Sequence, residues 1–458
     1  MTEQTGPKPE PLKDANAIPE VIGGMTLREK AKLCGGALTF ETHAVERLGI
    51  PALVLADGHN GINSFHLMDN YVHRVGGRHG MDAEAIADAR RLVRGKGAAG
   101  LEALLAGRLE GTVWDDVLAE HGLFLHALSE HVRQEVPAAG LPSCFPTGIV
   151  MGATWDPALV GACGRAVARE ARAFGVDVLL GPNVNIHRDP VCGRVFESYS
   201  EDPHLSARIG VGYIEGVQAE GVAAVVKHYV ANNQEHERLG VNAKITDRAL
   251  REIYFPSFKA AVREADCWMV MSAYNKVNGE ACAMHRWLLT DVLRGEWGFA
   301  GFVVSDWGAA YDRVAALAAG NDLEMPGPCD PEAIVEAVRT GQLAEAQLDE
   351  RVGNILRVLI KLPAFLRTPR PELDREGSRR VARQVAADGM VLLRNGREAL
   401  PLREGRLAVF GPNAREPIAT GAGSAGVISP HVVSLAEGLG ARYGAGNVAV
   451  DELPPDAH

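Results

Sequence analysis

One pattern recurs along the chain from residue 52 to residue 305: an almost wholly apolar run, then polar residues, then apolar residues at helical spacing. The apolar runs are Ala52–Ala56, Val176–Leu180, Val222–Val226, Trp268–Ser272 and Phe302–Ser305. A strand that is apolar along its whole length must be covered on both faces, which favours a parallel sheet with crossover helices. The intervening helices are predicted at 159–174, 205–219 and 249–265. The pattern therefore predicts an α/β fold.

Polar or aromatic residues follow every apolar run. They are Asp57, Gly181–Asn185, Lys227–His228, Tyr274–Asn275 and Asp306–Trp307. An open doubly wound sheet binds its ligand in one crevice, whereas a barrel gathers the carboxyl ends of all its strands into one site. Five ends of this kind favour a (β/α)8 TIM-like barrel.

The 458 residues suffice for about three domains, or for one large barrel and a smaller domain. We predict a polar tail over 1–20 and a barrel over 21–361, interrupted by a helical insertion at about 66–140. Within the insertion, helices are expected at 83–93 and 114–136. A Pro-rich, charged linker over 362–385 leads to 386–458, which is expected to be the start of a second α/β domain.

Composition excludes several classes of protein. A net charge of −11 argues against nucleic-acid binding. The sequence contains no run of 18 apolar residues, so it predicts no membrane span. The amino terminus lacks a basic segment followed by an apolar run, so the expected location is cytoplasmic. The seven cysteines are scattered and are predicted to be free thiols. No metal-binding spacing occurs among the fifteen histidines, and no cofactor is expected.

Three segments are candidates for chemistry. Asp306, at the end of an apolar run, could be a nucleophile, a metal ligand or a helix cap. Lys227 and His228 precede the amide- and carboxyl-rich run 232–235, which suits hydroxyl groups. Arg194 lies in a ten-residue segment with three acids and two aromatic residues, and helix capping accounts for only Asp202 of these. The Gly421–Gly426 string has G-x-G-x-x-G spacing but no strand directly before it, so we predict a glycine-rich loop, not a dinucleotide site.

The chain resembles glycoside hydrolase family 3, the β-glucosidase-like family. The resemblance rests on five strings in the same order, and on AADGMVLLRNGREALPL (386–402) and LAVFGPNA (407–414) in the second domain. The five strings are GPNVNIHRDPVCGRVFESYSEDPHLS (181–206), KHYVANNQEHER (227–238), MSAYNKVNG (271–279), GFVVSDWGA (301–309) and DLEMPG (322–327). It extends from about Met25 to the end, except for residues 66–140.

The resemblance implies a barrel followed by an α/β sandwich, and a retaining, exo-acting β-glycosidase, foremost a β-glucosidase, acting on a small carbohydrate or glycoside. It implies that Asp306 is the nucleophile and that Trp307 forms a wall of the sugar pocket. Ser424 would reach the site from the second domain. The remaining substrate-binding residues implied by the resemblance are Asp57, Arg194, Lys227, His228, Arg238, Met271 and Tyr274. Lys227 and Arg194 are expected to keep Asp306 ionised.

The sequence departs from the family in three ways. Asn63 stands where a sugar-contacting arginine is often found, and the 66–140 segment replaces a short loop. The family's general acid is a glutamate of the second domain, and neither Glu437 nor Glu452 has the expected context. We therefore expect the 458-residue chain to lack its general acid/base. Three alternatives stay open: a sugar-binding homologue without turnover, a β-xylosidase or other β-glycosidase, and an aldolase that uses Lys227 as a Schiff-base amine.

Overall fold

The computed structural model describes residues 10–136, 140–421, 423–429 and 431–451. Its centre is a parallel sheet in the order β10-β7-β5-β4-β3. The strands are β3 (Leu55–Asp57), β4 (Val178–Leu180), β5 (Ala223–Tyr229), β7 (Met269–Ser272) and β10 (Phe302–Ser305). All residues in these strands are buried. Each predicted strand is present, and β5 extends far enough to include Lys227 and His228.

A β-hairpin closes the sheet into a ring, which confirms the TIM-like barrel. Val304 of β10 pairs in parallel with Leu323, and Glu324 pairs in parallel with Gly35. Gly35 leads into the hairpin β1 (Gly36–Leu38) and β2 (Glu41–Thr42), and Glu41 pairs with Val54 directly before β3. The antiparallel pairing at this position was not anticipated from the sequence.

Alternate residues of the strands contribute to different cores. Leu55, Val178 and Phe302 belong to the core that includes the closing hairpin, whereas Ala56 and Leu179 belong to the core under the surrounding helices. Because side chains in a strand alternate between its faces, both faces must be apolar when both are covered. This explains why the strand sequences are almost wholly apolar up to their polar carboxyl ends.

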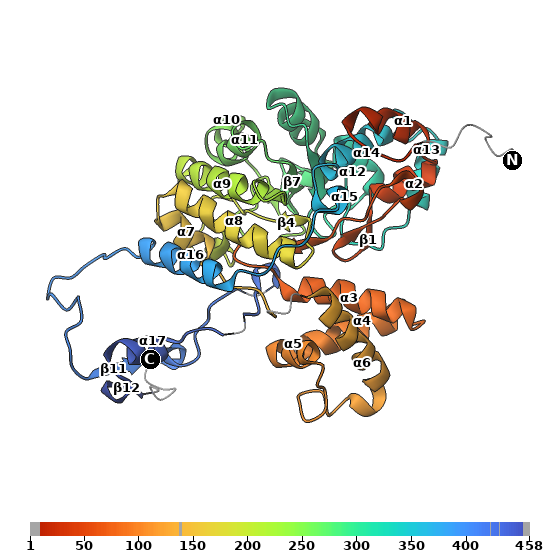
Figure 1. The fold of residues 1–458 in the computed structure, drawn as a ribbon. Coiled ribbons are helices and arrows are strands. Elements are labelled where there is room, and N and C mark those ends of the chain that lie inside the picture. Colours follow the sequence, from red (N-terminus) through yellow and green to blue (C-terminus); the bar gives the residue numbers. More distant parts are fainter. Residues whose placement is uncertain (1–9, 137–139, 422, 430, 452–458) are drawn as a thin grey trace.

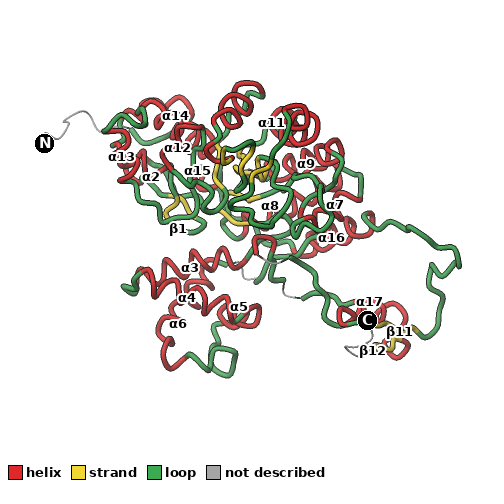
Figure 2. Tube along the Cα trace, turned by 180° about the vertical axis from the view of Figure 1, so that it is seen from behind, coloured by secondary structure: helices red, strands yellow, loops and turns green. Residues whose placement is uncertain are grey.

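Helices cover the outside of the ring (Figures 1 and 2). They include α8 (Pro157–Ala173), α9 (Pro203–Gln218), α10 (Asp247–Ala249), α11 (Pro256–Arg263), α12 (Arg313–Ala319), α13 (Glu332–Arg339) and α14 (Glu345–Leu359). The helix predicted at 249–265 is divided, because a π-helical turn at Leu250–Tyr254 precedes Pro256, which has no N–H to donate. Other short elements are α1 (Ile18–Gly23), α2 (Leu27–Leu33), α7 (Gly148–Ala153), β6 (Asn242–Ala243), β8 (Lys276–Val277) and β9 (Glu280–Ala281).

The amino-terminal segment is more ordered than a polar tail over 1–20 implies. Residues 1–9 lie outside the described part, but Leu12 is buried and α1 already begins at Ile18, also buried. The apolar side chains of this segment fill the core beneath α14, which the polar composition of the segment did not indicate.

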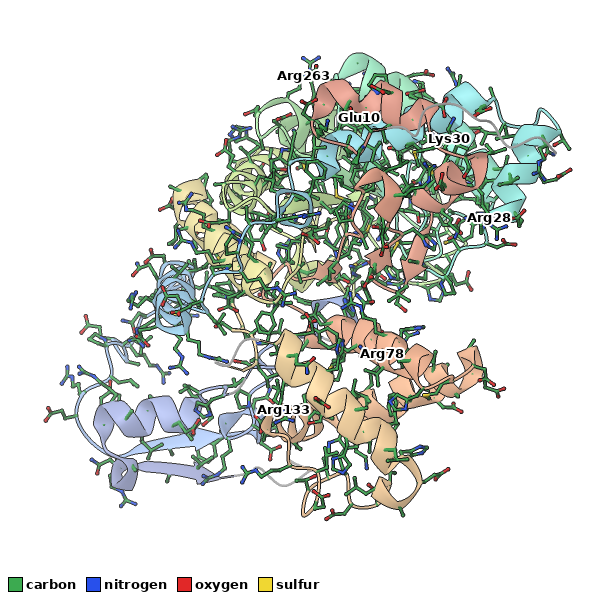
Figure 3. All side chains as sticks on the ribbon, turned by 45° about the vertical axis from the view of Figure 1, so that its right-hand side comes forward. Glu10, Arg28, Lys30, Arg78, Arg133 and Arg263 are labelled. Atoms are coloured by element: carbon green, nitrogen blue, oxygen red, sulfur yellow. The ribbon has the colours of Figure 1, made fainter. Side chains whose placement is uncertain are left out.

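Four helices form a separate group beside the barrel, in the segment 64–135. They are α3 (Ser64–Arg78), α4 (Ala83–Gly95), α5 (Gly97–Ala106) and α6 (Leu118–Glu135). In Figure 3 this group carries Arg78 and Arg133, and it stands apart from the helices that carry Lys30 and Arg263. We call it the helical insertion.

After the barrel, α15 (Pro363–Leu366) and α16 (Arg375–Asp388) precede a long irregular segment. The boundary predicted between 385 and 386 falls inside α16, which Asp374 caps and which packs against α8. Residues 390–393 (MVLL) are exposed and in no regular structure. Beyond them, β11 (Leu407–Phe410) and β12 (Val448–Asp451) pair in parallel beside α17 (Leu435–Tyr443), away from the barrel in Figure 1.

Candidate active site

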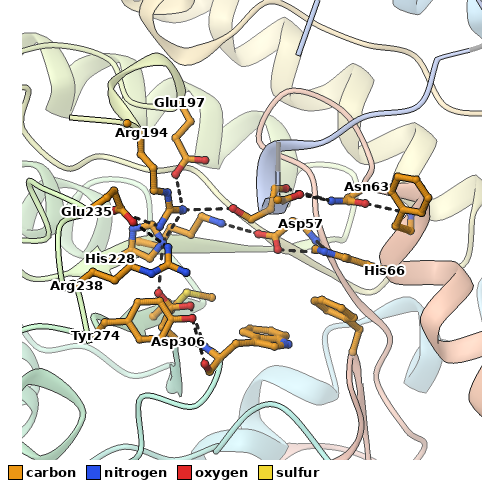
Figure 4. A pocket seen from close by; sticks show the side chains of 18 of the residues that line it. Asp57, Asn63, His66, Arg194, Glu197, His228, Glu235, Arg238, Tyr274 and Asp306 are labelled. Carbon is orange, nitrogen blue, oxygen red and sulfur yellow. Dashed lines mark hydrogen bonds and ion pairs between the residues drawn. The ribbon is translucent and has the colours of Figure 1, made fainter. Parts of the chain in front are cut away.

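A cavity of about 690 Å³ opens at the carboxyl ends of the barrel strands. Its wall is formed by the strand ends of the barrel with the segments that follow them, the closing hairpin, the helical insertion and the glycine-rich loop (Figure 4). All nine residues proposed from the sequence line it, namely Asp57, Arg194, Lys227, His228, Arg238, Met271, Tyr274, Asp306 and Trp307. Ser424 lines it as well.

Asp306 directly follows β10 and is only 7% exposed. Its Oδ1 accepts a hydrogen bond from the backbone N–H of Trp307 at 2.8 Å, while Oδ2 accepts none from the described residues. The next helix, α12, is capped by Asp312, so Asp306 is not a helix cap. One carboxylate oxygen is thus held in place, and the other makes no hydrogen bond with the described residues.

Burial raises the pKa of Asp306 above the ordinary value for an aspartate. Arg194, Lys227 and the N–H of Trp307 lower this pKa, but they do not outweigh the burial. The two cations thus act in the direction expected from the sequence, and the net shift of the Asp306 pKa is nevertheless upward.

His228 lies on the other side of Asp306, with its Nε2 3.6 Å from Oδ2. Burial lowers the pKa of His228 well below its ordinary value, and the cations Arg194 and Lys227 lower it further, so the ring is neutral. Its Nδ1 lies 3.0 Å from Asn185 Oδ1, and an Arg194 nitrogen lies 3.1 Å from its Nε2. Nδ1 therefore carries the proton, and Nε2 accepts from Arg194.

Asp57 and Lys227 form a buried ion pair deeper in the cavity, with Nζ 2.6 Å from Oδ1. Burial raises the pKa of Asp57, and Lys227 opposes this rise. His66, the third residue of α3, lies beside the pair, where its Nδ1 accepts from the Asp57 N–H at 3.3 Å. Burial lowers the pKa of His66 to about 3, so it adds no charge here.

Two arginines and two glutamates form an ion-pair network on the opposite wall. Arg194 pairs with Glu197 and lies 3.8 Å from Glu235, which also binds Arg238 at 2.8 Å. Arg238 in turn lies over the ring of Tyr274, 4.7 Å from its centroid. Burial lowers the pKa of Arg194, but Glu197 and Asp306 raise it by more, so this guanidinium stays charged.

Aromatic rings form the remaining wall. Trp307 donates its indole N–H to Thr39 O at 2.9 Å, and Phe40 stacks on both Trp307 and His66. The Tyr274 hydroxyl donates to Trp307 O at 3.1 Å. A flat aromatic surface next to directional polar groups suits a sugar ring, which has apolar faces and a polar rim.

Several residues of the cavity wall are not among the site residues predicted from the sequence. Glu197 and Glu235 lie inside segments that the sequence marks as candidates for chemistry, but neither is predicted as a site residue. Phe40, Phe65, His66 and Arg94 gave no such signal, because only the fold brings the hairpin and the insertion to the strand ends. Within the described residues, no group of three His, Cys, Asp or Glu side chains is arranged to hold a metal ion.

A buried carboxylate, cationic hydrogen-bond donors and an aromatic wall thus meet at the strand ends of a barrel. The profile "Glycosyl hydrolase family 3 N terminal domain" matches residues 120–358, and "Glycosyl hydrolase family 3 C-terminal domain" matches residues 390–454. The chain belongs to glycosyl hydrolase family 3.

Relatives and solved structures agree with this assignment. The chain is 41% identical over 411 residues to thermostable beta-glucosidase B of Acetivibrio thermocellus, and this match covers 89% of this chain and 46% of the relative. It is 36% identical over 431 residues to an exo-alpha-(1->6)-L-arabinopyranosidase of Bifidobacterium breve, covering 92% and 49%. Beta-glucosidase 3B from Thermotoga neapolitana, solved with alpha-D-glucose, superposes with a TM-score of 0.75 at 36% identity, covering 95% of this chain and 55% of that one. The chain spans about half the length of the curated relatives it matches. Among the described residues, no helix could cross a membrane.

Proposed function

We propose that this chain binds the terminal sugar of a β-glycoside, foremost a β-glucoside, and supplies the nucleophile for its retaining hydrolysis. The observation that carries the proposal is the placement of Asp306, which lines the cavity among hydrogen-bond donors. One of its carboxylate oxygens is held by the Trp307 N–H, and the other accepts no hydrogen bond from the described residues.

In the proposed reaction, the carboxylate of Asp306 attacks the anomeric carbon and the bond from that carbon to the leaving oxygen breaks. Water then attacks the same carbon, the ester bond to Asp306 breaks and restores the carboxylate, and the proton of the water passes to solvent. Asp57, Lys227 and His228 bind the hydroxyl groups of the sugar, with Arg194 and Arg238 on the facing wall. Trp307, Met271 and Tyr274 pack against the ring. No metal or cofactor takes part in these steps.

Retaining hydrolysis also needs a proton donor for the leaving oxygen. Besides Asp306, the carboxylates that line the cavity each pair with a cation: Asp57 with Lys227, Glu197 with Arg194, and Glu235 with Arg238. Glu437 caps α17 by bonding to Ser434 and is not among the cavity residues. Glu452 lies outside the described residues. We therefore propose that none of the described carboxylates serves as the general acid.

Lys227 is poorly suited to Schiff-base chemistry. Its buried ammonium donates to Asp57, and an aldolase needs a free amine that can attack a carbonyl. The paired geometry favours binding over nucleophilic catalysis, so we propose the glycosidase and not the aldolase.

The test is covalent labelling of the 458-residue chain with 2,4-dinitrophenyl 2-deoxy-2-fluoro-β-glucoside, followed by peptide mass spectrometry. We expect one added fluoroglucosyl group on the peptide that contains Asp306, and none in the matched Asp306→Asn variant. Labelling of another carboxylate would overturn the assignment. Glucose binding without any labelling would instead support a sugar-binding homologue that does not turn over.

A further inference from the structure

The side chain of Asn63 joins two cavity walls that are 360 residues apart in the sequence. It is 1% exposed and lies between β3 and α3, as the last residue before α3 begins. Its Oδ1 accepts from the Phe65 N–H at 3.1 Å and so caps α3, the first helix of the insertion. Its Nδ2 donates to Gly423 O at 2.9 Å and lies 3.4 Å from Ser424 O, and both belong to the glycine-rich loop (Figure 4).

The glycine-rich loop has few other polar contacts with the barrel. Arg194 donates to Ser424 Oγ at 3.4 Å, and Cys144 Sγ lies 3.6 Å from Ala419 O. Within the loop, Thr420 Oγ1 donates to Ala425 O at 2.6 Å. These contacts are longer or internal, so the 2.9 Å bond from Asn63 is the shortest polar tether between the described loop residues and the barrel.

Close packing at the same place shows that the loop is seated on the barrel. A Cβ atom added to Gly421 would lie 2.2 Å from the ring of Phe196, and one added to Gly61 would lie 3.2 Å from the side chain of Val427. The absence of a side chain at Gly421 therefore lets the loop lie against Phe196, and the absence of one at Gly61 lets the turn before Asn63 lie against Val427 and the backbone of Ser143.

We propose that Asn63 is a positioning residue that holds the glycine-rich loop as a wall of the sugar cavity, and that it couples this wall to the start of the helical insertion. One amide group performs both tasks, because its oxygen begins α3 while its nitrogen binds the loop. Ser424 would then contact substrate only while Asn63 holds the loop. This consequence for substrate rests on the proposed function, whereas the tether itself does not.

The two tasks of Asn63 can be separated by substitution. Asn63→Asp keeps an oxygen that caps α3 but replaces the donor with a carboxylate facing two carbonyl oxygens. Asn63→Ser also retains a capping oxygen and is too short to reach the loop. As a matched control, Asp82→Ala removes the cap of α4, whose N–H donor is Ala85 at 2.9 Å, and leaves the loop contacts untouched.

The experiment measures amide hydrogen exchange of residues 419–427 in the 458-residue chain, together with glucose affinity by calorimetry. We expect Asn63→Asp and Asn63→Ser to speed exchange in the loop at least fivefold while α3 exchanges as in the unaltered chain. Asp82→Ala should speed exchange in α4 alone. Loop exchange that is unchanged in Asn63→Asp overturns the proposal.

Glucose affinity then tests the link to the site. Asn63→Asp should weaken glucose binding roughly five- to tenfold, and Ser424→Ala should weaken it in the unaltered chain but not further in Asn63→Asp. Independent, additive losses would show that Asn63 does not act through Ser424. If the unaltered chain does not bind glucose at all, the proposed function fails, and the exchange data still decide whether Asn63 holds the loop.

Discussion

Lys227→Met should destabilise the fold in a way that depends on pH, because it leaves a buried carboxylate without its partner. The ammonium and the Asp57 carboxylate are 2.6 Å apart, and their side chains are only 3% and 9% exposed. Methionine conserves the length of the lysine stem, so the packing changes little. The main effect is therefore electrostatic.

The cost at pH 7.5 follows from the geometry. Removing one partner of a buried ion pair costs about 3–5 kcal/mol, because the other charge is left uncompensated. Arg194 also lowers the pKa of Asp57 and stays in place, so we expect the lower end, about 3 kcal/mol. In the variant, the folded-state pKa of Asp57 lies further above its unfolded value of about 3.9, so the native state binds the proton more tightly. Stability is then highest below that value and falls as the pH rises through the folded pKa.

The assay is urea unfolding followed by tryptophan fluorescence at pH 4.5 and pH 7.5. Lys227→Met should lose clearly more stability at pH 7.5 than at pH 4.5, relative to the unaltered chain. The control is Asp57→Asn combined with Lys227→Met, which should cost less than the sum of the single variants and show no added pH dependence. An equal loss at both pH values, or additive single effects, would refute the reasoning.

Three further predictions concern activity and binding. In Arg194→Met, the acid limb of kcat/KM for 2,4-dinitrophenyl glucoside should move to higher pH, because a cation that lowers the raised pKa of Asp306 is lost; a limb that moves to lower pH would contradict this. Arg94 and Arg90 share one buried carboxylate, Asp69, so the cavity wall formed by Arg94 keeps a net positive charge. Arg94→Gln should therefore weaken the binding of an aryl glucoside that carries a carboxylate on its aglycone by up to about fivefold, relative to the binding of its amide analogue. The unaltered chain should cleave dinitrophenyl glucoside at least 100-fold faster than cellobiose, since general acid help is worth about 10²–10⁴-fold; equal rates would reveal an acid among its residues.

The strands of the barrel could be predicted because a strand that is buried on both faces has consecutive apolar residues in its sequence. Val176–Leu180 and Phe302–Ser305 are apolar on both faces, and the structure shows why, since one face meets the barrel interior and the other meets helices. Their polar ends could be grouped for the same reason, because parallel strands deliver these ends to one side. Asp306 is a candidate from its position alone, since it directly follows an apolar run.

The closing hairpin and the insertion contacts could not be derived in this way. β1 and β2 are three and two residues long, too short to show a period. They pair with each other, and bridges from Gly35 to Glu324 and from Glu41 to Val54 join them to the ring. His66 lies in α3, where residues 66–72 are all buried, so its sequence pattern does not show which neighbours each side chain meets. Its contact with Asp57 depends on how the insertion leaves the barrel.

Asn63 illustrates a further limit of pattern reading. As a residue type before Ser64-Phe65 it predicts a helix cap, and the structure contains that cap. The same side chain also binds a loop 360 residues later, and no local sequence pattern encodes such a contact. Judged only by its departure from a family motif, the position loses an interaction with the sugar. In the folded chain its amide instead binds the backbone of the glycine-rich loop, and Gly423 and Ser424 of that loop line the cavity.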